Sequence, residues 1–329
     1  MTSSTIPIEL PGQVGFLATA TICMVLPTTL VVLRILARRR TSLSLNGSDF
    51  CIMAALTFDI GLCIVDYFMV LKGGFGFHIK DIERRFGPET LVTFNKCIAA
   101  WPILWSCCVM TSKWSVLLMY QTLIPVARMK LAVRIVGTFI VLFAIGGILE
   151  AFLICRPYAK NYYINLPGTC GNVRTFYIWL SALNLFSDLV ILFLPIPFLY
   201  KLQMPLKKRL GLISMFMVGV LTCVVTLYRQ TTLGNMDLTD ITSSGLLAFL
   251  ASTIEIAVAI CIACLPFLRA LWGSLSSQRG GSSNNYESCG SRGLANGRRT
   301  LKNDGFGHLP DDSSEIRLQP VEPNSGRLV

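Results

Sequence analysis

The sequence predicts an all-α, polytopic membrane protein: a bundle of seven transmembrane helices. Seven apolar stretches of near membrane-spanning length lie between about Gln13 and Trp272. A helix needs about 20 apolar residues to cross the hydrocarbon core, and unsatisfied backbone groups are so costly in lipid that such stretches must be helical. The composition agrees, since 53% of the residues are hydrophobic and only 14% are charged, whereas soluble domains carry about 25% charged residues.

The seven predicted spans cover residues 13–36, 50–71, 97–124, 132–154, 175–200, 210–230 and 246–271. They divide the chain into a short N-terminal segment (1–12), a transmembrane domain (13–272) and a tail (273–329). The tail is rich in Ser, Gly, Asn and Arg and has few large apolar residues. Because such a segment cannot bury enough apolar surface to fold alone, we expect a disordered cytoplasmic tail.

The distribution of charge predicts how the chain is oriented. The net charge is +11, and basic residues gather in short loops on one side, as at Arg38, Arg39 and Arg40 and at Lys207, Lys208 and Arg209. Cytoplasmic loops carry an excess of Lys and Arg, which lie beside anionic lipids. We therefore expect a multi-pass protein of the plasma membrane or an endomembrane, with the N-terminus outside and the C-terminus in the cytosol. Membrane lipids, and not nucleic acid, are the partners that this pattern indicates.

Ionisable residues within the spans are candidate functional residues, because charge is expensive in lipid. Four lie deep by position: Asp59, Lys113, Asp188 and Glu255. Lys113 is the only deep cation, and Asp188 and Glu255 are its natural partners, so we predict an intramembrane polar network. The network would either fix helix packing or bind a ligand, proton or ion, and both roles stay open here. Three further residues lie near span ends, where side chains can extend to the interface: Arg34, Glu150 and Arg229.

The cysteines fall into two groups. Most of the twelve lie within apolar spans and are interpreted as small buried apolar residues. Cys155 and Cys170 instead flank a loop on the predicted outer side, where disulfides persist, and we predict that they pair. Cys97, near the same end of span three, is the alternative partner, and free thiols are a third option. With two histidines and no repeated Cys-x-x-Cys metal spacing, we predict no metal site and no cofactor.

Several motifs in order resemble one known family. The first is the stretch from Val32 to Arg38 followed by Asn46, Gly47, Ser48 and Asp49. The next matches are Lys113 to Tyr120, Phe152 to Pro157 with Cys170 and Asn172, Asn184 with Asp188, Leu194 to Pro197, Lys208, Phe216, Gly219, Arg229, Glu255, Cys264 to Pro266, Leu268 and Arg269. Over roughly residues 25–272 this set resembles the fungal rhodopsin-domain family, which includes the satratoxin-cluster type and Pth-type receptor-like membrane proteins.

The chain also departs from the family pattern. Tyr162 and Tyr163 stand in the loop where the family usually has a Trp, and Gln121 and Thr122 replace the Arg that commonly follows the span-three Tyr. The resemblance does not imply light sensing, because a retinal pigment needs a lysine in its last span for the Schiff base. Residues 246–271 contain no lysine.

Three functions are compatible with these features. The resemblance implies first an accessory, sensing or regulatory component associated with secondary-metabolite biosynthesis, with a small lipophilic molecule as its ligand and no enzymatic activity. The alternative is an integral-membrane cyclase or other enzyme acting on a lipophilic biosynthetic intermediate, in which Asp188, Glu255 or Asp59 would be the catalytic acid. The third is a small-molecule exporter, although no repeated halves are apparent. No motif in the tail identifies a cytosolic partner.

Overall fold

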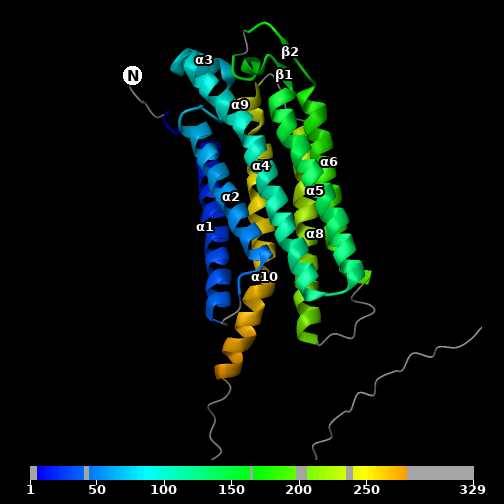
Figure 1. Cartoon of the computed structure of the whole chain (residues 1–329). Coiled ribbons are helices and arrows are strands. Elements are labelled where there is room, and N and C mark those ends of the chain that lie inside the picture. Colours follow the sequence, from blue (N-terminus) through cyan, green and yellow to red (C-terminus); the bar gives the residue numbers. More distant parts are fainter. Residues whose placement is uncertain (1–5, 41–43, 164–165, 198–205, 235–239, 280–329) are drawn as a thin grey trace, which may run out of the picture. The chain divides into compact units, whose positions relative to one another are not determined.

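The structure is a computed structural model that describes residues 6–40, 44–163, 166–197, 206–234 and 240–279. Long helices lying side by side dominate it (Figure 1). In the described part these are α1 (Pro11–Arg40), α2 (Gly47–Leu71), α4 (Pro88–Leu123), α5 (Ala127–Leu153), α6 (Val173–Phe193), α8 (Leu206–Gly234) and α10 (Leu246–Arg279).

The prediction of an all-α polytopic membrane protein is confirmed. Among the described residues, six segments are long and apolar enough to span a membrane: α1, α2, α4, α5, α6 and Ile241–Leu265. The seventh long helix is α8, with 29 residues. In the span predicted at 175–200, α6 ends at Phe193, just before Pro195 and Pro197, and residues 198–200 lie outside the described residues. A proline removes a helical hydrogen bond and disfavours the helical conformation of the preceding residue.

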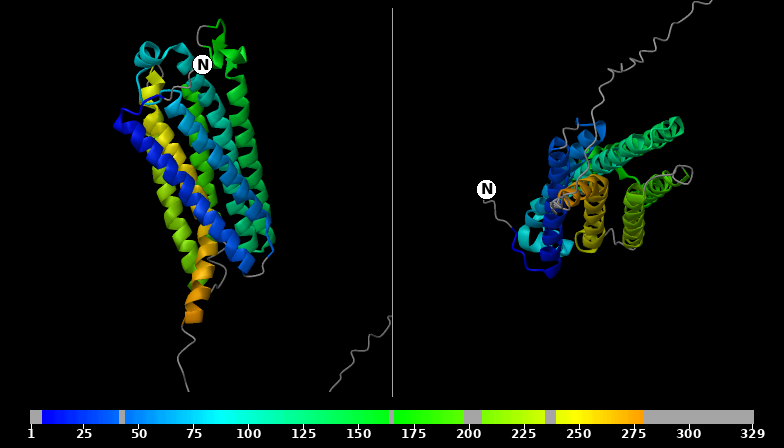
Figure 2. Two further views of the ribbon diagram at one scale, coloured as in Figure 1. Left: turned by 90° about the vertical axis from the view of Figure 1, so that its left-hand side faces the viewer. Right: turned by 90° about the horizontal axis from the view of Figure 1, so that it is seen from below.

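The long helices form a closed ring. Each contacts the next in the order α1, α2, α4, α5, α6, α8 and α10, and α10 returns to contact α1, as Figure 2 shows. α4 and α10 also contact each other across the bundle. Close approach of α4 and α5 depends on Gly137, because a Cβ atom there would lie 2.6 Å from the ring of Trp114. α10 continues to Arg279, beyond the predicted domain boundary at Trp272. Residues 280–329 of the predicted tail lie outside the described residues.

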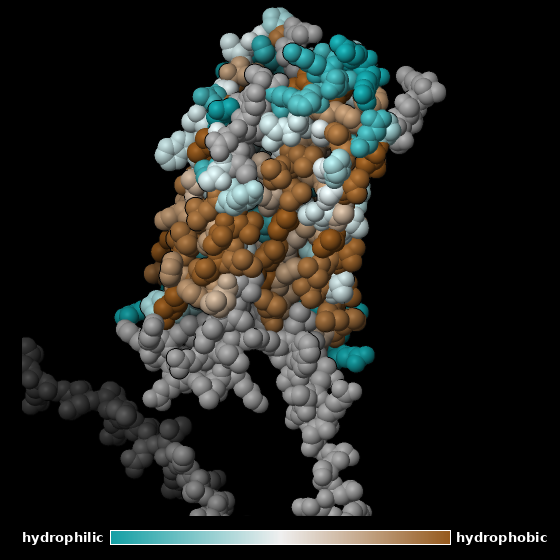
Figure 3. Space-filling model, turned by 180° about the vertical axis from the view of Figure 1, so that it is seen from behind, coloured by the Kyte–Doolittle hydropathy of each residue, from teal (hydrophilic) through white to brown (hydrophobic). Residues whose placement is uncertain are grey.

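The surface of the bundle is suited to lipid. Large apolar side chains such as Ile22, Ile135 and Leu142 are each more than 60% exposed. On the face in Figure 3, hydrophobic residues cover the middle of the bundle and hydrophilic residues cover one end. Soluble monomers rarely expose apolar surface on this scale. The apolar band therefore marks the part of the protein that faces the hydrocarbon core.

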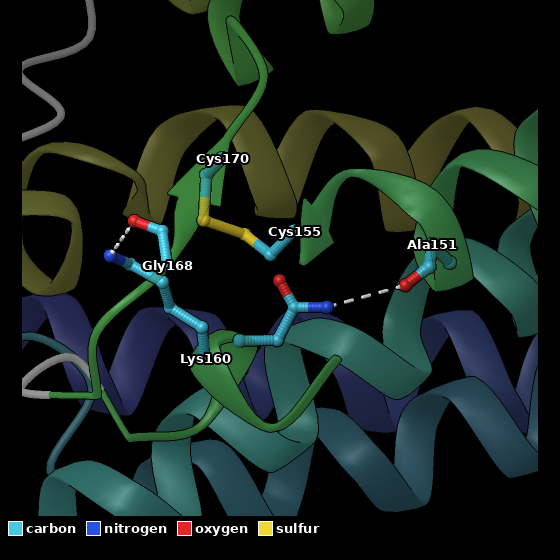
Figure 4. Close-up of a disulfide and its surroundings, with 6 residues drawn as sticks. Ala151, Cys155, Lys160, Gly168 and Cys170 are labelled. Atoms are coloured by element: carbon cyan, nitrogen blue, oxygen red, sulfur yellow. Dashed lines mark hydrogen bonds between the residues drawn. A yellow bond between two sulfur atoms is a disulfide. The ribbon is translucent and has the colours of Figure 1, made fainter. Parts of the chain in front are cut away.

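One end of the bundle carries the short elements, and we call it the hairpin end. It holds α3 (Ile79–Phe86), α9 (Ile241–Ser244), the 3-10 helix η1 (Tyr158–Asn161) and the antiparallel strands β1 (Cys155–Arg156) and β2 (Thr169–Cys170). The structure joins Cys155 and Cys170 by a disulfide (Figure 4), and Cys97 is a free thiol. Lys160 Nζ donates a hydrogen bond to Gly168 O across the same loop. Closing a loop of this length contributes about 3 kcal/mol in the chain-entropy model.

The opposite end of the bundle is held by a buried ionic cluster. Arg34 is fully buried and contacts Asp49 at 2.9 Å, Ser48 Oγ at 2.7 Å and the carbonyl of Ala263 at 2.6 Å. Arg38 Nε lies 2.8 Å from the other oxygen of Asp49. The position of Arg34 near a span end suggested that its side chain would extend to the interface, but the side chain is buried instead. Ser48 and Asp49 lie in the first turn of α2, and Ala263 lies on α10. The cluster therefore joins α1, α2 and α10.

At the hairpin end, a contact outside the membrane spans links the α2–α3 connection to α9. His78 precedes α3, and its Nδ1 meets Asp240 Oδ2, while Asp240 Oδ1 accepts a hydrogen bond from the N–H of Ile79 at 3.2 Å. The hydrogen bond with Asp240 and its negative charge raise the pKa of His78. Burial acts to raise the pKa of Asp240, but hydrogen bonds from His78, Ile79 and Thr242 outweigh it and lower that pKa.

These shifts predict a pH window for the contact. A raised histidine pKa means that its stabilisation is complete below about pH 6.5 and is lost as pH rises through the folded-state pKa. A lowered aspartate pKa means that its stabilisation is present above about pH 4 and is lost as pH falls further. The sequence contains two histidines, so NMR of histidine-labelled protein carrying His308→Gln reports His78 alone. We expect Asp240→Asn to lower the pKa of His78 towards 6.5; an unchanged pKa would contradict the contact.

Candidate functional site

A network of ionic and polar side chains lies in the middle of the bundle, where four helices meet. At one side of it, Lys113 of α4 reaches α6. Lys113 Nζ lies 3.0 Å from Asp188 Oδ1 and donates hydrogen bonds to Asn184 Oδ1 at 2.7 Å and to Ser187 Oγ at 2.5 Å. Ser187 and Asp188 lie three and four residues after Asn184, so all three side chains share one face of α6. The lysine is 7% exposed, so the polar face of α6 replaces water as its solvation shell.

At the other side of the network, Glu255 of α10 joins α6 and α8. Glu255 Oε1 accepts hydrogen bonds from Asn184 Nδ2 at 2.6 Å and from Thr226 Oγ1 at 3.1 Å, and Oε2 lies 3.3 Å from Arg229 Nε. Arg229 also donates to Ser252 Oγ at 2.9 Å and to Ser181 Oγ at 2.7 Å. Its guanidinium group lies 5.0 Å from the ring of Trp105. Asn184 therefore connects the lysine and the glutamate, and α4, α6, α8 and α10 share one network.

The structure brings together three of the four residues predicted for this network. Lys113, Asp188 and Glu255 belong to it, whereas Asp59 does not. Asp59 lies on α2, is fully buried, and has no hydrogen-bond partner for either carboxylate oxygen within the described part of the chain. Two turns further along α2, Asp66 accepts hydrogen bonds from Trp101 Nε1 at 3.1 Å and from Thr253 Oγ1 at 3.0 Å. The two α2 carboxyl groups thus have different surroundings despite equal burial.

Arg229 is the main network residue that the sequence interpretation misplaced. Its position near a predicted span end suggested that it would extend to the interface, but it is 6% exposed and pairs with Glu255. A sequence signal was available, because α8 carries Thr226 and Arg229 three residues apart and α10 carries Ser252 and Glu255 at the same spacing. Such pairs share a helix face. With Arg229 included, two cations and two carboxylates balance the charge of the network.

A cavity of about 80 Å³ borders the network, and we call it the network cavity. Its polar lining consists of the network residues Lys113, Asn184, Asp188 and Glu255 together with Ser112, Thr222 and the hydroxyl of Tyr120. The rest of its wall consists mainly of apolar residues: Val109, Val116, Ile191, Leu192, Ile256, Ala259 and Ile262. A water molecule requires only about 10–15 Å³ of such space, so the cavity has room for several waters or for part of a small molecule.

A second cavity, of about 110 Å³, lies beside Arg229, and we call it the aromatic cavity. Trp101, Trp105, Tyr177 and Phe249 contribute to its wall together with Ser181, Arg229 and Ser252. Val173 and Ile241, which begin α6 and α9, also line it and place it towards the hairpin end. Glu255 borders the network cavity and Arg229 borders the aromatic cavity. The ion pair between them therefore separates the two spaces.

The site presents charged and hydrogen-bonding groups to the network cavity. Among the described residues, no group of three or more His, Cys, Asp or Glu side chains has the arrangement of a metal centre. Both network carboxylates face cations, in the ion pairs Lys113–Asp188 and Arg229–Glu255. The site can hold a polar or charged ligand group against an otherwise apolar wall.

The two buried carboxyl groups of α2 give a matched test of this geometry. Replacing Asp66 with leucine should lower the free energy of unfolding by about 1–3 kcal/mol, because Trp101 Nε1 and Thr253 Oγ1 would lose their acceptor. Asp59→Leu should leave stability unchanged or raise it, because it removes buried oxygens that have no hydrogen bond. Both variants can be compared by denaturant unfolding in lipid nanodiscs. Equal destabilisation by the two substitutions would contradict the different surroundings described here.

Comparison with known proteins agrees with this architecture. The chain is similar to the "Polyenoic acids biosynthesis gene cluster protein Ba17b" of Metarhizium anisopliae, with 27% identity over 64% of this chain and 58% of that protein. It is also similar to a "SAT4 family membrane protein" of Emericella nidulans, with 28% identity over 48% of this chain and 41% of that protein. "Receptor GIN3" of Arthrobotrys oligospora is 25% identical over 48% of this chain and 39% of its own length.

These matches cover about half the length of the curated relatives. The family model described as the fungal rhodopsin domain matches residues 33–274, which include all of the network residues and the disulfide. The chain therefore belongs to the fungal rhodopsin domain family.

Proposed function

We propose that this protein is a receptor-like accessory component of secondary-metabolite biosynthesis that binds a small lipophilic molecule in the network cavity. The observation that carries the proposal is the wall of that cavity. Lys113, Asp188 and Glu255 line it, and the same side chains hold α4, α6, α8 and α10 together. A ligand that hydrogen-bonds to them changes the interactions between helices, which is the differential contact that a conformational response requires.

The family and the relatives support this proposal. One relative is named for a polyenoic acid gene cluster and another is named a receptor. The first name supports an association with secondary-metabolite biosynthesis, and the second supports a receptor-like role. The network cavity supplies the physical basis for it, since mostly apolar cavities with a few convergent polar groups are typical ligand sites.

The orientation that fits this role has the N-terminus and the hairpin end outside and the C-terminus in the cytosol. Two features support it. The disulfide between Cys155 and Cys170 lies at the hairpin end, and disulfides persist in oxidising compartments. Arg38, Arg39 and Arg40 end α1 at the opposite end, as expected of a cytoplasmic boundary.

The enzyme alternative has one observation in its favour, namely that Asp188 and Glu255 both line the network cavity. Their interactions argue against it. An acid that starts a cyclisation must donate a proton to the substrate, whereas Asp188 accepts from Lys113, and Glu255 accepts from Asn184 and Thr226 and faces Arg229. Asp59, the third candidate acid, is absent from the lining of both cavities.

A cavity-filling variant tests the proposal. Ala259 lines the network cavity, and Ala259→Leu should fill it without removing any network group. In a strain that lacks the gene, the wild-type protein should restore the normal metabolite profile, whereas Ala259→Leu should accumulate in membranes at a normal level without restoring it. Val258→Leu, which adds volume at the neighbouring position outside either cavity, is the control and should behave as wild type. The measurement is metabolite profiling by mass spectrometry.

Two results would contradict the proposal. Full restoration of the metabolite profile by Ala259→Leu would show that the function does not require a ligand in the network cavity. A discrete precursor that accumulates in the deletion strain, and that membranes with the wild-type protein convert, would establish an enzyme. The expected result is a general change in product levels without conversion of any precursor.

A further inference from the structure

The aromatic cavity has the composition of a binding site for an apolar molecule with one negative charge. Arg229 is the single charged residue among the described residues that line it. The other walls are aromatic or aliphatic apart from Ser181, Ser252 and the hydroxyl of Tyr177. An uncompensated anion in such surroundings would be strongly unfavourable. A ligand anion can therefore be accommodated only next to Arg229.

The guanidinium group of Arg229 uses different nitrogen atoms towards the two cavities. Its Nε faces Glu255, which borders the network cavity, at 3.3 Å. Its two terminal nitrogens donate to Ser252 Oγ and Ser181 Oγ, at 2.9 and 2.7 Å, and both hydroxyls line the aromatic cavity. The terminal nitrogens thus bind neutral oxygens on the side of the aromatic cavity. Charged acceptors form hydrogen bonds with arginine roughly twice as strong as neutral ones, and carboxylates bind the group in a bidentate manner.

The aromatic side chains determine which ligand shapes the aromatic cavity can hold. Trp101 and Trp105 stack with ring centroids 6.3 Å apart and an interplanar angle of 16°, and Phe249 meets Trp101 edge-on at 4.9 Å. Such surfaces accept a planar ring or a conjugated chain by stacking or edge contacts. An apolar cavity of about 150 Å³ binds benzene, so about 110 Å³ fits a chain segment or, with small side-chain adjustments, one ring.

We propose that the aromatic cavity binds a planar, apolar carboxylic acid, whose carboxylate replaces the hydroxyls of Ser181 and Ser252 on the terminal nitrogens of Arg229. This site is distinct from the network cavity and does not depend on the function proposed for it. Arg229 already balances Glu255, so a bound carboxylate must compete with Glu255 for the guanidinium group. Uptake of one proton by Glu255 then keeps the buried charges balanced. Occupation of the aromatic cavity therefore weakens the ion pair that connects α8 to α10 and separates the two cavities.

The binding test uses three single-ring probes of similar size: benzoate, neutral benzamide and cationic benzylamine. Each is titrated against the full chain in lipid nanodiscs by ligand-observed NMR, with empty nanodiscs as the blank for partition into lipid. Benzoate should bind about tenfold or more tightly than benzamide, and benzylamine should not bind. Equal binding of benzoate and benzamide, or no benzoate binding up to about 10 mM, would overturn the proposal.

Matched variants locate the site. Ala248 lines the aromatic cavity and Ala259 lines the network cavity, and both lie on α10. Ala248→Leu should abolish benzoate binding, and Ala259→Leu should retain it. The double variant Arg229→Gln with Glu255→Gln, which leaves no buried charge unpaired, should fold and lose the preference for benzoate over benzamide. Retention of that preference in the double variant, or loss of binding in Ala259→Leu but not in Ala248→Leu, would contradict the assignment.

Discussion

The pairing of four charges inside an apolar bundle is the constraint on which the centre of this structure depends. Lys113, Asp188, Arg229 and Glu255 come from α4, α6, α8 and α10, and each lies against an opposite charge. A charge without a partner at this depth costs several kcal/mol, so the helices can pack closely only in arrangements that keep the pairs together. Asn184 extends the constraint, because it hydrogen-bonds to both Lys113 and Glu255. The network thereby sets the relative positions of four helices at once.

In the function proposed above, the same constraint would couple ligand binding to helix packing. The network cavity and the aromatic cavity lie beside one ion pair, with Glu255 in the wall of one and Arg229 in the wall of the other. A polar ligand in either space changes the partners available to that pair. Because packed helices move as units between discrete arrangements, a local exchange of partners can be converted into a helix displacement. At the two ends of the bundle, the cluster of Arg34 and Asp49 joins α1, α2 and α10, and the disulfide closes the loop between α5 and α6.

The sequence was sufficient to predict the features that depend on local composition. The helical bundle follows from the length of the apolar runs, and Lys113, Asp188 and Glu255 stand out because charge is rare in such runs. The position of Asp59 outside the network could not be predicted, since it depends on which face of α2 meets α4 and which meets α10. The burial of Arg34 and Arg229 was missed for a related reason: nearness to a span end gives depth along the helix but not the side that a residue faces. The cavities depend on how seven helices pack, which no local pattern encodes.

The most direct test of this account is a double-mutant cycle on Arg229 and Glu255, measured as the free energy of unfolding in lipid nanodiscs. Each single change, Arg229→Gln or Glu255→Gln, should cost about 3–5 kcal/mol, because it leaves the other charge buried and unpaired. The double variant should recover most of that loss, giving a coupling energy of several kcal/mol. If the two single effects simply add, the ion pair does not hold α8 to α10, and the central role assigned to the network is wrong.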